Sequence, residues 1–262
     1  MLIKVCGLRD SENVKAVDAL GVDMTGFVFV AQSPRYVEMI NSGAGTMPDY
    51  SETRLKEAQK ATDPQTDGCV TERCAGGPKE ENRTESQNIQ KHPLRVGVFV
   101  DDMPQNIITR VYNYGLDYIQ LHGDESPVMI DNLRRSLVPD IVSDIKIIKA
   151  ISISSPDDLR KCHEYVGHAD MLLFDTKCST AGGSGCKFDW SFLCDYKEDI
   201  PFLLSGGIGP DDADNIMNIR HPMMAGIDLN SRFETSPAVK DVERLRIFIT
   251  KIRNHEQDKR TV

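Results

Sequence analysis

Short runs of β-branched and aliphatic residues alternate with amphipathic segments along most of the chain. Eight runs predict strands, at about residues 2–6, 25–30, 95–100, 117–121, 145–151, 170–175, 201–205 and 225–229. The segments between them carry helix-start signals, as in Ser11-Glu12-Asn13-Val14, Met103-Pro104 and Ser155-Pro156. Alternating strands and helices predict a parallel sheet, and eight units favour a closed (β/α)8 barrel, the TIM-barrel architecture, over an open doubly wound sheet.

One region interrupts this alternation. Between residues 41 and 93, only three residues belong to the large apolar types Leu, Ile, Val, Phe and Trp. Such a composition buries too little apolar surface to offset the entropy lost on ordering. We therefore predict one barrel domain over residues 1–262, interrupted by a polar, mobile insertion between strands two and three. Residues 51–60 predict a reduced second helix, whereas Cys69 and Cys74 lack a nearby histidine pair and favour a polar loop over a metal site.

The composition argues against several classes of protein. At 262 residues, of which 40% are hydrophobic, the chain is long enough for one large core. The 31 basic and 40 acidic side chains give a net charge of −9, which argues against nucleic acid or a membrane surface as partner. No apolar run approaches the roughly 18 residues of a membrane span, and the start of the sequence lacks the apolar core of a signal peptide. Seven cysteines, an odd number, predict reduced thiols and a cytoplasmic protein.

A glycine-rich turn, Ser205-Gly206-Gly207-Ile208-Gly209-Pro210, follows the seventh predicted strand and precedes a helix-like segment at 211–216. Glycines let backbone N–H groups approach an oxyanion, and the N-terminus of a following helix favours the same charge. A second turn, Gly226-Ile227-Asp228-Leu229-Asn230-Ser231, ends the eighth strand. Since barrel phosphate sites form at the turns after the last two strands, the pair predicts a site for a phosphorylated small molecule. A turn that merely connects strand to helix is the alternative.

Active sites of such barrels form at the carboxyl ends of the strands, and three candidate residues lie there. Cys6 ends the first strand, where neighbouring N–H groups and Lys4 or Arg9 can stabilise a thiolate base. Asp175 ends an apolar strand, and burial there favours its proton-donating acid form. Arg35, just beyond the second strand, offers a fork that suits a carboxylate. The corresponding alternatives are a buried apolar cysteine, a carboxylate that caps a turn and a surface arginine.

Several ordered motifs lie at these strand ends and turns. They are Lys4-Val5-Cys6-Gly7, Gly26-Phe27-Val28-Phe29, Ser33-Pro34-Arg35-Tyr36, Val96-Gly97-Val98-Phe99-Val100, Gln120-Leu121-His122-Gly123-Asp124-Glu125, Phe174-Asp175, Gly182-Gly183-Ser184-Gly185 and Leu204-Ser205-Gly206-Gly207-Ile208. Together they resemble the phosphoribosylanthranilate isomerase family of tryptophan biosynthesis, over nearly the whole chain except about residues 41–93. The resemblance implies an Amadori rearrangement of N-(5-phosphoribosyl)anthranilate to 1-(2-carboxyphenylamino)-1-deoxyribulose 5-phosphate, without metal or cofactor.

The same resemblance implies roles for the candidate residues. It makes Asp175 the general acid that protonates the furanose ring oxygen, and Cys6 the general base that takes the C2 proton of the opened Schiff base. It also implies that Arg35 pairs with the anthranilate carboxylate. The implied phosphate ligands are Gly206, Gly207, Asn230 and Ser231, and the implied pocket-lining residues are His122 and Asp228.

The sequence departs from the family after the eighth strand. Many members have a Ser-Gly pair there, whereas this chain has Asn230-Ser231-Arg232. Which of these three residues contacts phosphate stays open. Arg232 either adds a charge to the site or pairs with Glu234 or another acid. The expected assembly is a monomer or homodimer.

Other functions are also consistent with a phosphate-binding barrel. A related sugar-phosphate isomerase of histidine synthesis would place an aspartate where Cys6 stands. A metal-dependent epimerase would need several histidines at strand ends, where only His122 qualifies. A non-catalytic barrel that binds a phosphorylated ligand is the alternative from another class, and the joint presence of Cys6, Asp175 and Arg35 argues against it.

Overall fold

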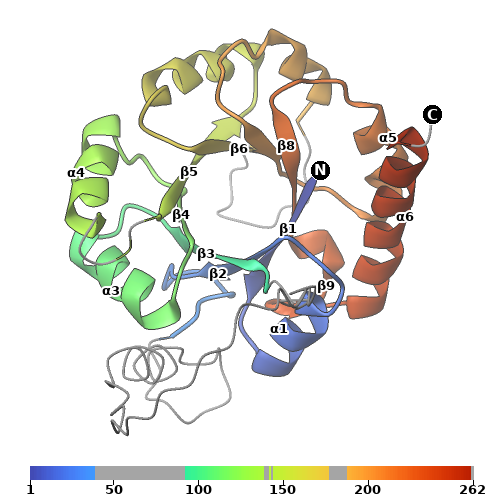
Figure 1. Cartoon of the computed structure of the whole chain (residues 1–262), viewed down its shortest axis with the longest axis horizontal. Coiled ribbons are helices and arrows are strands. Elements are labelled where there is room, and N and C mark those ends of the chain that lie inside the picture. Colours follow the sequence, from blue (N-terminus) through green and yellow to red (C-terminus); the bar gives the residue numbers. More distant parts are fainter. Residues whose placement is uncertain (39–91, 139–141, 143, 177–187, 261–262) are drawn as a thin grey trace, which may run out of the picture.

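In the computed structural model, eight parallel strands close into a barrel that a ring of helices surrounds (Figure 1). The structure describes residues 1–38, 92–138, 142, 144–176 and 188–260. The strands are β1 (Leu2–Leu8), β2 (Met24–Val28), β3 (Leu94–Phe99), β4 (Tyr118–Leu121), β5 (Lys146–Ile153), β6 (Met171–Thr176), β7 (Phe202–Leu204) and β8 (Met224–Leu229). They follow sequence order around the barrel, and β1 pairs with β8 to close it. The predicted TIM barrel and its eight strands are thus confirmed.

The helices begin at the local signals that the sequence carries. The α-helices are α1 (Ser11–Asp18), α3 (Pro104–Tyr114), α4 (Pro127–Leu137), α5 (Ala213–Asn218) and α6 (Val242–Arg260). The 3-10 helices are η1 (Pro156–Tyr165), η2 (Trp190–Asp195), η3 (Pro210–Asp212) and η4 (Ser231–Phe233). Proline occupies the first turn of α3 and α4, where its missing N–H has no helical partner to lose. The segment predicted from Ser155-Pro156 forms a 3-10 helix, and the one after the glycine run begins as a 3-10 turn.

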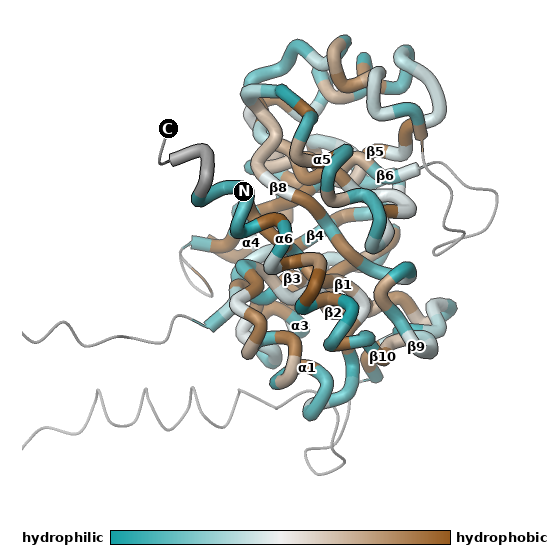
Figure 2. Tube along the Cα trace, turned by 90° about the vertical axis from the view of Figure 1, so that its right-hand side faces the viewer, coloured by the Kyte–Doolittle hydropathy of each residue, from teal (hydrophilic) through white to brown (hydrophobic). Residues whose placement is uncertain are grey.

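The barrel interior changes character along its axis. One apolar cluster inside it combines side chains from several strands, including Met24, Val96, Ile148 and Leu203. Alternate residues of β1 continue this interior face toward the carboxyl ends of the strands with the fully buried Lys4 and then Cys6. A second apolar layer lies between the strands and the helices, and Figure 2 shows hydrophobic residues concentrated along the strands. The barrel interior is therefore apolar at one end and carries polar side chains toward the carboxyl ends of the strands.

A short hairpin that the sequence pattern did not predict follows the last barrel strand. It consists of β9 (Glu234–Ser236) and β10 (Val239–Lys240), which pair antiparallel (Figure 2). The backbone of Lys240 is attached to α1, because its N–H donates to Asn13 Oδ1 at 2.8 Å and its carbonyl accepts from Asn13 Nδ2 at 3.0 Å. The hairpin thereby brings charged residues from the C-terminal part of the chain beside β1.

Some predictions fall on residues that the structure does not describe. These are most of the insertion predicted at 41–93, the possible helix at 51–60, Cys69, Cys74 and the motif at 182–185. Among the described cysteines, Cys6, Cys162 and Cys194 are free thiols. Within the described residues, no helix combines the length and the apolar character needed to cross a membrane.

Candidate active site

Cys6 lies inside the barrel near the carboxyl end of β1 and is only 4% exposed. Its Sγ rests on β2 at Gly26, where an added Cβ would come within 2.7 Å of the sulfur. Burial raises the pKa of the thiol, and the ammonium groups of Lys4 and Lys240 act in the opposite direction without outweighing burial. Lys4 thus acts on the thiol in the direction that the sequence suggested, but burial has the larger effect, and the role of Cys6 as the base stays a prediction. Arg9 donates to the carbonyl of Pro34.

Beneath Cys6, a buried ion pair crosses from β1 to β8. Lys4 Nζ lies 2.8 Å from Asp228 Oδ1, and both side chains are almost completely inaccessible to solvent. The second carboxylate oxygen of Asp228 accepts from Ser205 Oγ at 3.3 Å. Burial acts to lower the pKa of Lys4, but Asp228 and Cys6 outweigh it and raise the pKa above its usual value. The predicted site residue Asp228 is thus a buried anion of the barrel interior, and its place in the substrate pocket stays a prediction.

Asp175 lies at the carboxyl end of β6, beside His122 and the glycine run. Its Oδ2 is 3.4 Å from His122 Nε2, and its Oδ1 accepts from the N–H of Thr176 at 2.9 Å. The side chain is 30% exposed, so the carboxyl is less buried than its apolar strand suggested. On the other side of the imidazole, His122 Nδ1 is 3.2 Å from Gln120 Nε2. His122 therefore lies between the Gln120 amide and the Asp175 carboxyl.

Arg35 is held by a carboxylate from the β9–β10 hairpin. Its Nε and Nη2 donate to the two carboxylate oxygens of Glu234, at 2.8 and 2.6 Å. Lys240 Nζ donates to the same carboxylate at 2.8 Å. Burial acts to raise the pKa of Glu234, but the bonds from Arg35 and Lys240 outweigh it and lower the pKa. The fork expected to receive a substrate carboxylate is therefore already engaged on one edge, which leaves Nη1 directed elsewhere.

The glycine run has left-handed backbone at two of its positions. Gly206 and Gly207 have φ values of +87° and +67°, which only glycine adopts readily. Asp212 Oδ2 accepts from the N–H of Gly209 at 2.6 Å and so fixes the end of the run. Arg232 packs beside the glycine run, since the Cβ atom of Arg232 lies 3.8 Å from the position that an added Cβ would take at Gly209.

The side chain of Asn230 contacts Lys240 and lies close to Gly7. Its Oδ1 accepts from Lys240 Nζ at 2.8 Å and lies 2.7 Å from the position of a Cβ added at Gly7. The side chain of Asn230 therefore belongs to the Arg35 and Cys6 side of the site. Ser231 begins η4 directly after it.

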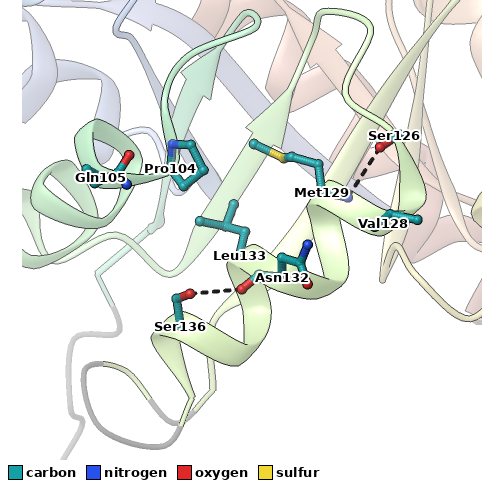
Figure 3. Close-up of a pocket in the computed structure, with 8 residues that line it drawn as sticks. All are labelled: Pro104, Gln105, Ser126, Val128, Met129, Asn132, Leu133 and Ser136. Atoms are coloured by element: carbon teal, nitrogen blue, oxygen red, sulfur yellow. Dashed lines mark hydrogen bonds between the residues drawn. The ribbon is translucent and has the colours of Figure 1, made fainter.

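A groove between α3 and α4 lies outside this site. Its lining includes Pro104, Met129 and Leu133, all from the outer helices (Figure 3). None of the candidate residues lines it. Among the described residues, no cluster of three or more His, Cys, Asp or Glu side chains could hold a metal ion.

Sequence reasoning named Glu234 only as a possible partner of Arg232, whereas the structure pairs it with Arg35 and Lys240. It assigned no role to Lys240 and did not place Gln120 against His122. The run Glu234-Thr-Ser-Pro-Ala-Val-Lys240 carries a hairpin signal, since two charged residues flank a turn-forming Ser-Pro-Ala. That signal predicts a turn, but nothing in it identifies Arg35 as the partner of Glu234.

The chain is similar to known proteins in both sequence and fold. The N-(5'phosphoribosyl)anthranilate (PRA) isomerase family model matches residues 49–251. The N-(5'-phosphoribosyl)anthranilate isomerases of Parabacteroides distasonis and Phocaeicola vulgatus are 39% and 35% identical to the chain, covering 96% and 98% of it and 93% and 100% of their own lengths. The crystal structure of the Thermotoga maritima enzyme superposes with a TM-score of 0.66 at 26% identity, covering 97% of this chain and all of that one. The chain therefore belongs to the phosphoribosylanthranilate isomerase family and is an isomerase of tryptophan biosynthesis.

Proposed function

We propose that this isomerase performs its rearrangement with Asp175 as general acid and Cys6 as general base. In the first step, the Asp175 carboxyl gives its proton to the furanose ring oxygen, the bond from that oxygen to C1 breaks, and a protonated Schiff base forms. In the second step, Cys6 takes the proton from C2, and the electron pair moves toward nitrogen to form an enolamine. Tautomerisation to the C2 ketone completes an isomerisation in which no atom is gained or lost. The observation that carries the proposal is the placement of both groups at the same end of one barrel.

The surroundings of Asp175 support its role as a proton donor that must be reloaded. His122 Nε2 lies 3.4 Å from Asp175 Oδ2, and both side chains are about one-third exposed. After Asp175 loses its proton, the imidazole can stabilise the carboxylate and return a proton from solvent. His122 therefore lines the pocket and supports the acid.

The surroundings of Cys6 support its role as a base that is strong once ionised. A thiol whose pKa is raised by burial binds a proton more tightly than a free cysteine, so it removes a carbon-bound proton more effectively. The same burial makes the ionised form costly, so nearby positive charge must offset it. Lys4 and Lys240 supply that charge.

For substrate binding, we propose that Arg35 contacts the anthranilate carboxylate through Nη1, since Nε and Nη2 engage Glu234. The phosphate is held by backbone N–H groups of Gly206 and Gly207 and by the chain at Asn230 and Ser231, with Arg232 beside the glycine run. A solved relative is a complex with reduced 1-(o-carboxyphenylamino)-1-deoxyribulose 5-phosphate. A ligand that carries both a benzoate carboxylate and a phosphate suits the two proposed binding groups of this chain, Arg35 for the carboxylate and the glycine run for the phosphate.

The remaining properties of the protein follow from the family by inference. The Thermotoga maritima relative is described as dimeric and also as monomers, and we infer a monomer or homodimer for this chain. We also infer that the protein is a single barrel domain. Its small phosphorylated substrate and its reduced cysteines indicate that it acts in the cytoplasm.

Two substitutions test the assignment of the acid and the base. Cys6→Ser and Asp175→Asn are each expected to lower kcat by at least about a hundredfold, because general acid–base catalysis contributes roughly 10² to 10⁴. The matched controls are Cys194→Ser, at an exposed free thiol, and Asp214→Asn, at an exposed carboxylate that pairs with Lys251. Turnover is measured with freshly prepared substrate, and near-normal kcat in either site variant contradicts the assignment.

A further inference from the structure

We propose that Lys240 is a positioning residue of this active site, whose buried ammonium supplies the excess positive charge that allows Cys6 to ionise. The inference rests on the proposed role of Cys6 as the base. Lys240 comes from β10, outside the barrel sheet, and acts through Cys6 rather than on the substrate.

The placement of Lys240 is fixed from both ends. Its backbone is bonded in both directions to Asn13 of α1, and its side chain is fully buried. Nζ donates to Glu234 Oε1 and to Asn230 Oδ1, each at 2.8 Å. The ammonium therefore has a defined position between the carboxylate that holds Arg35 and the amide of Asn230.

A contact at Gly7 connects this position to Cys6. Gly7 has φ +79°, and a Cβ added there would lie 2.7 Å from Asn230 Oδ1 and 2.6 Å from Arg35 Cδ. Asn230 Oδ1, which accepts the hydrogen bond from Lys240, and the aliphatic part of Arg35 thus pack directly on Gly7, the residue after Cys6. Consistent with this proximity, the Lys240 ammonium acts to lower the pKa of the Cys6 thiol.

The charges around Cys6 show why Lys240 matters. Among the residues that the structure describes, the cations are Lys4 of β1, Arg35 beyond β2 and Lys240 of β10, and the carboxylates are Asp228 of β8 and Glu234 of β9. The other packed side chains, Val28 of β2 and Val98 of β3, bring no charge.

Three cations against two carboxylates leave one positive charge, which a Cys6 thiolate neutralises. Lys4 is paired with Asp228, and Arg35 is paired edge-on with Glu234. The cation beyond these two pairs is Lys240. Without it the fixed charges sum to zero, and a thiolate would be an uncompensated anion in a buried site.

Burial lowers the pKa of Lys240 itself, and Glu234 and Cys6 act to raise it. The lysine and the thiol therefore support each other's charged forms. This mutual effect distinguishes an electrostatic role from a purely structural one. Removing the charge of Lys240 should change the pKa of Cys6 even when the packing is preserved.

The test measures the ionisation of Cys6 in the full-length protein without substrate. The rate of alkylation by iodoacetamide is followed against pH, and mass spectrometry of the Cys6 peptide separates it from the other cysteines. Lys240→Met is expected to move the midpoint of Cys6 alkylation up by about 1 pH unit or more, as loss of a close opposite charge does. A shift of that size lowers the thiolate fraction, and with it kcat near neutral pH, about tenfold or more.

Two companion variants make the outcome decisive. Glu234→Gln removes an anion from the same cluster and is expected to move the Cys6 midpoint down, although it also breaks bonds to Arg35 and Lys240. Lys251→Met removes an exposed ammonium that pairs with Asp214, and is expected to leave the midpoint unchanged. Lys240→Gln, which keeps a hydrogen-bond donor without the charge, replaces Lys240→Met if that variant fails to fold.

An unchanged midpoint in a folded Lys240 variant overturns the inference, even if activity falls. Shifts of the same sign in the Lys240 and Glu234 variants also overturn it, since they would report disturbed packing. Full activity of Cys6→Ser is a separate result that contradicts the proposed role of Cys6 as the base, and the alkylation measurement does not depend on it.

Discussion

The ion pair between Lys4 and Asp228 offers a test of how charge is maintained inside the barrel. Asp228→Leu removes the anion and leaves the Lys4 ammonium buried, with Cys6 as its remaining neighbour of opposite potential charge. Lys4→Met makes the reverse change and leaves the carboxylate with Ser205 Oγ. The double variant Lys4→Met/Asp228→Leu replaces both charges with apolar side chains of similar bulk.

The expected magnitudes follow from the burial of the pair. Removing one partner of a buried ion pair destabilises a protein by about 3–5 kcal/mol, whereas replacing both partners with apolar groups is often neutral or stabilising. At about 2–4 °C per kcal/mol for a domain of this size, each single variant should melt about 6–20 °C below the parent. The double variant should melt above both single variants.

Thermal unfolding followed by circular dichroism measures these differences, and pH provides a second check. In Asp228→Leu, the isolated buried ammonium has a folded-state pKa below its unfolded value. The unfolded state then binds more protons, so the stability of this variant should rise relative to the parent as the pH increases from neutral toward the lysine range. If the double variant loses the sum of the two single effects, the two charges do not stabilise one another and the reasoning fails.

Three further predictions concern the clamp, the hairpin and the insertion. Arg35→Ala should raise KM about tenfold to a hundredfold, from the roughly 1.5–3 kcal/mol of a hydrogen bond to a charged group, and an unchanged KM would reject the clamp assignment. The pKa of Glu234 is lowered from its ordinary value of 4.5, so the stability that its carboxylate contributes is present above that value and is lost as the pH falls. Glu234→Gln should therefore lose less stability on acidification than the parent, and an equal loss in both proteins would contradict this. A protein that joins Ala61 to Lys91 should keep its kcat/KM, since the removed residues are mostly polar and loop length adds little entropy cost, whereas loss of activity in a folded deletion would identify the segment as a lid.

The barrel was predictable because each strand is specified by a short continuous run of apolar residues. Runs such as Met171-Leu172-Leu173-Phe174 are apolar on both faces, which is what a parallel strand between core and helices requires. Helix starts at Pro104 and Ser126-Pro127 are equally local. The 3-10 geometry of η1 was not predicted, because its capping box and proline at the first position are compatible with either helix type.

The arrangement of the site was only partly predictable. Cys6, Asp175 and Arg35 could be chosen as candidates because strand ends are known positions in a barrel, although their roles stay predictions. The partners that set their charge could not be read from one sequence, since Glu234 is 199 positions from Arg35. The pKa of Cys6 depends on burial and on nearby cations, which act in opposite directions, and only the fold shows that burial has the larger effect.

The closure of the barrel by β1 and β8 has a consequence for how the chain is made. Lys4 and Asp228 lie 224 positions apart, and the β9–β10 hairpin is translated later still. At about 5–20 residues per second, a ribosome needs roughly 10–45 seconds to deliver the closing strand after the first has emerged. Throughout that interval one edge of β1 lacks its partner, and such an edge is a template for wrong pairing. The newborn chain therefore passes through an aggregation-prone period, and its active site is assembled last, when the two distant parts of the polypeptide meet.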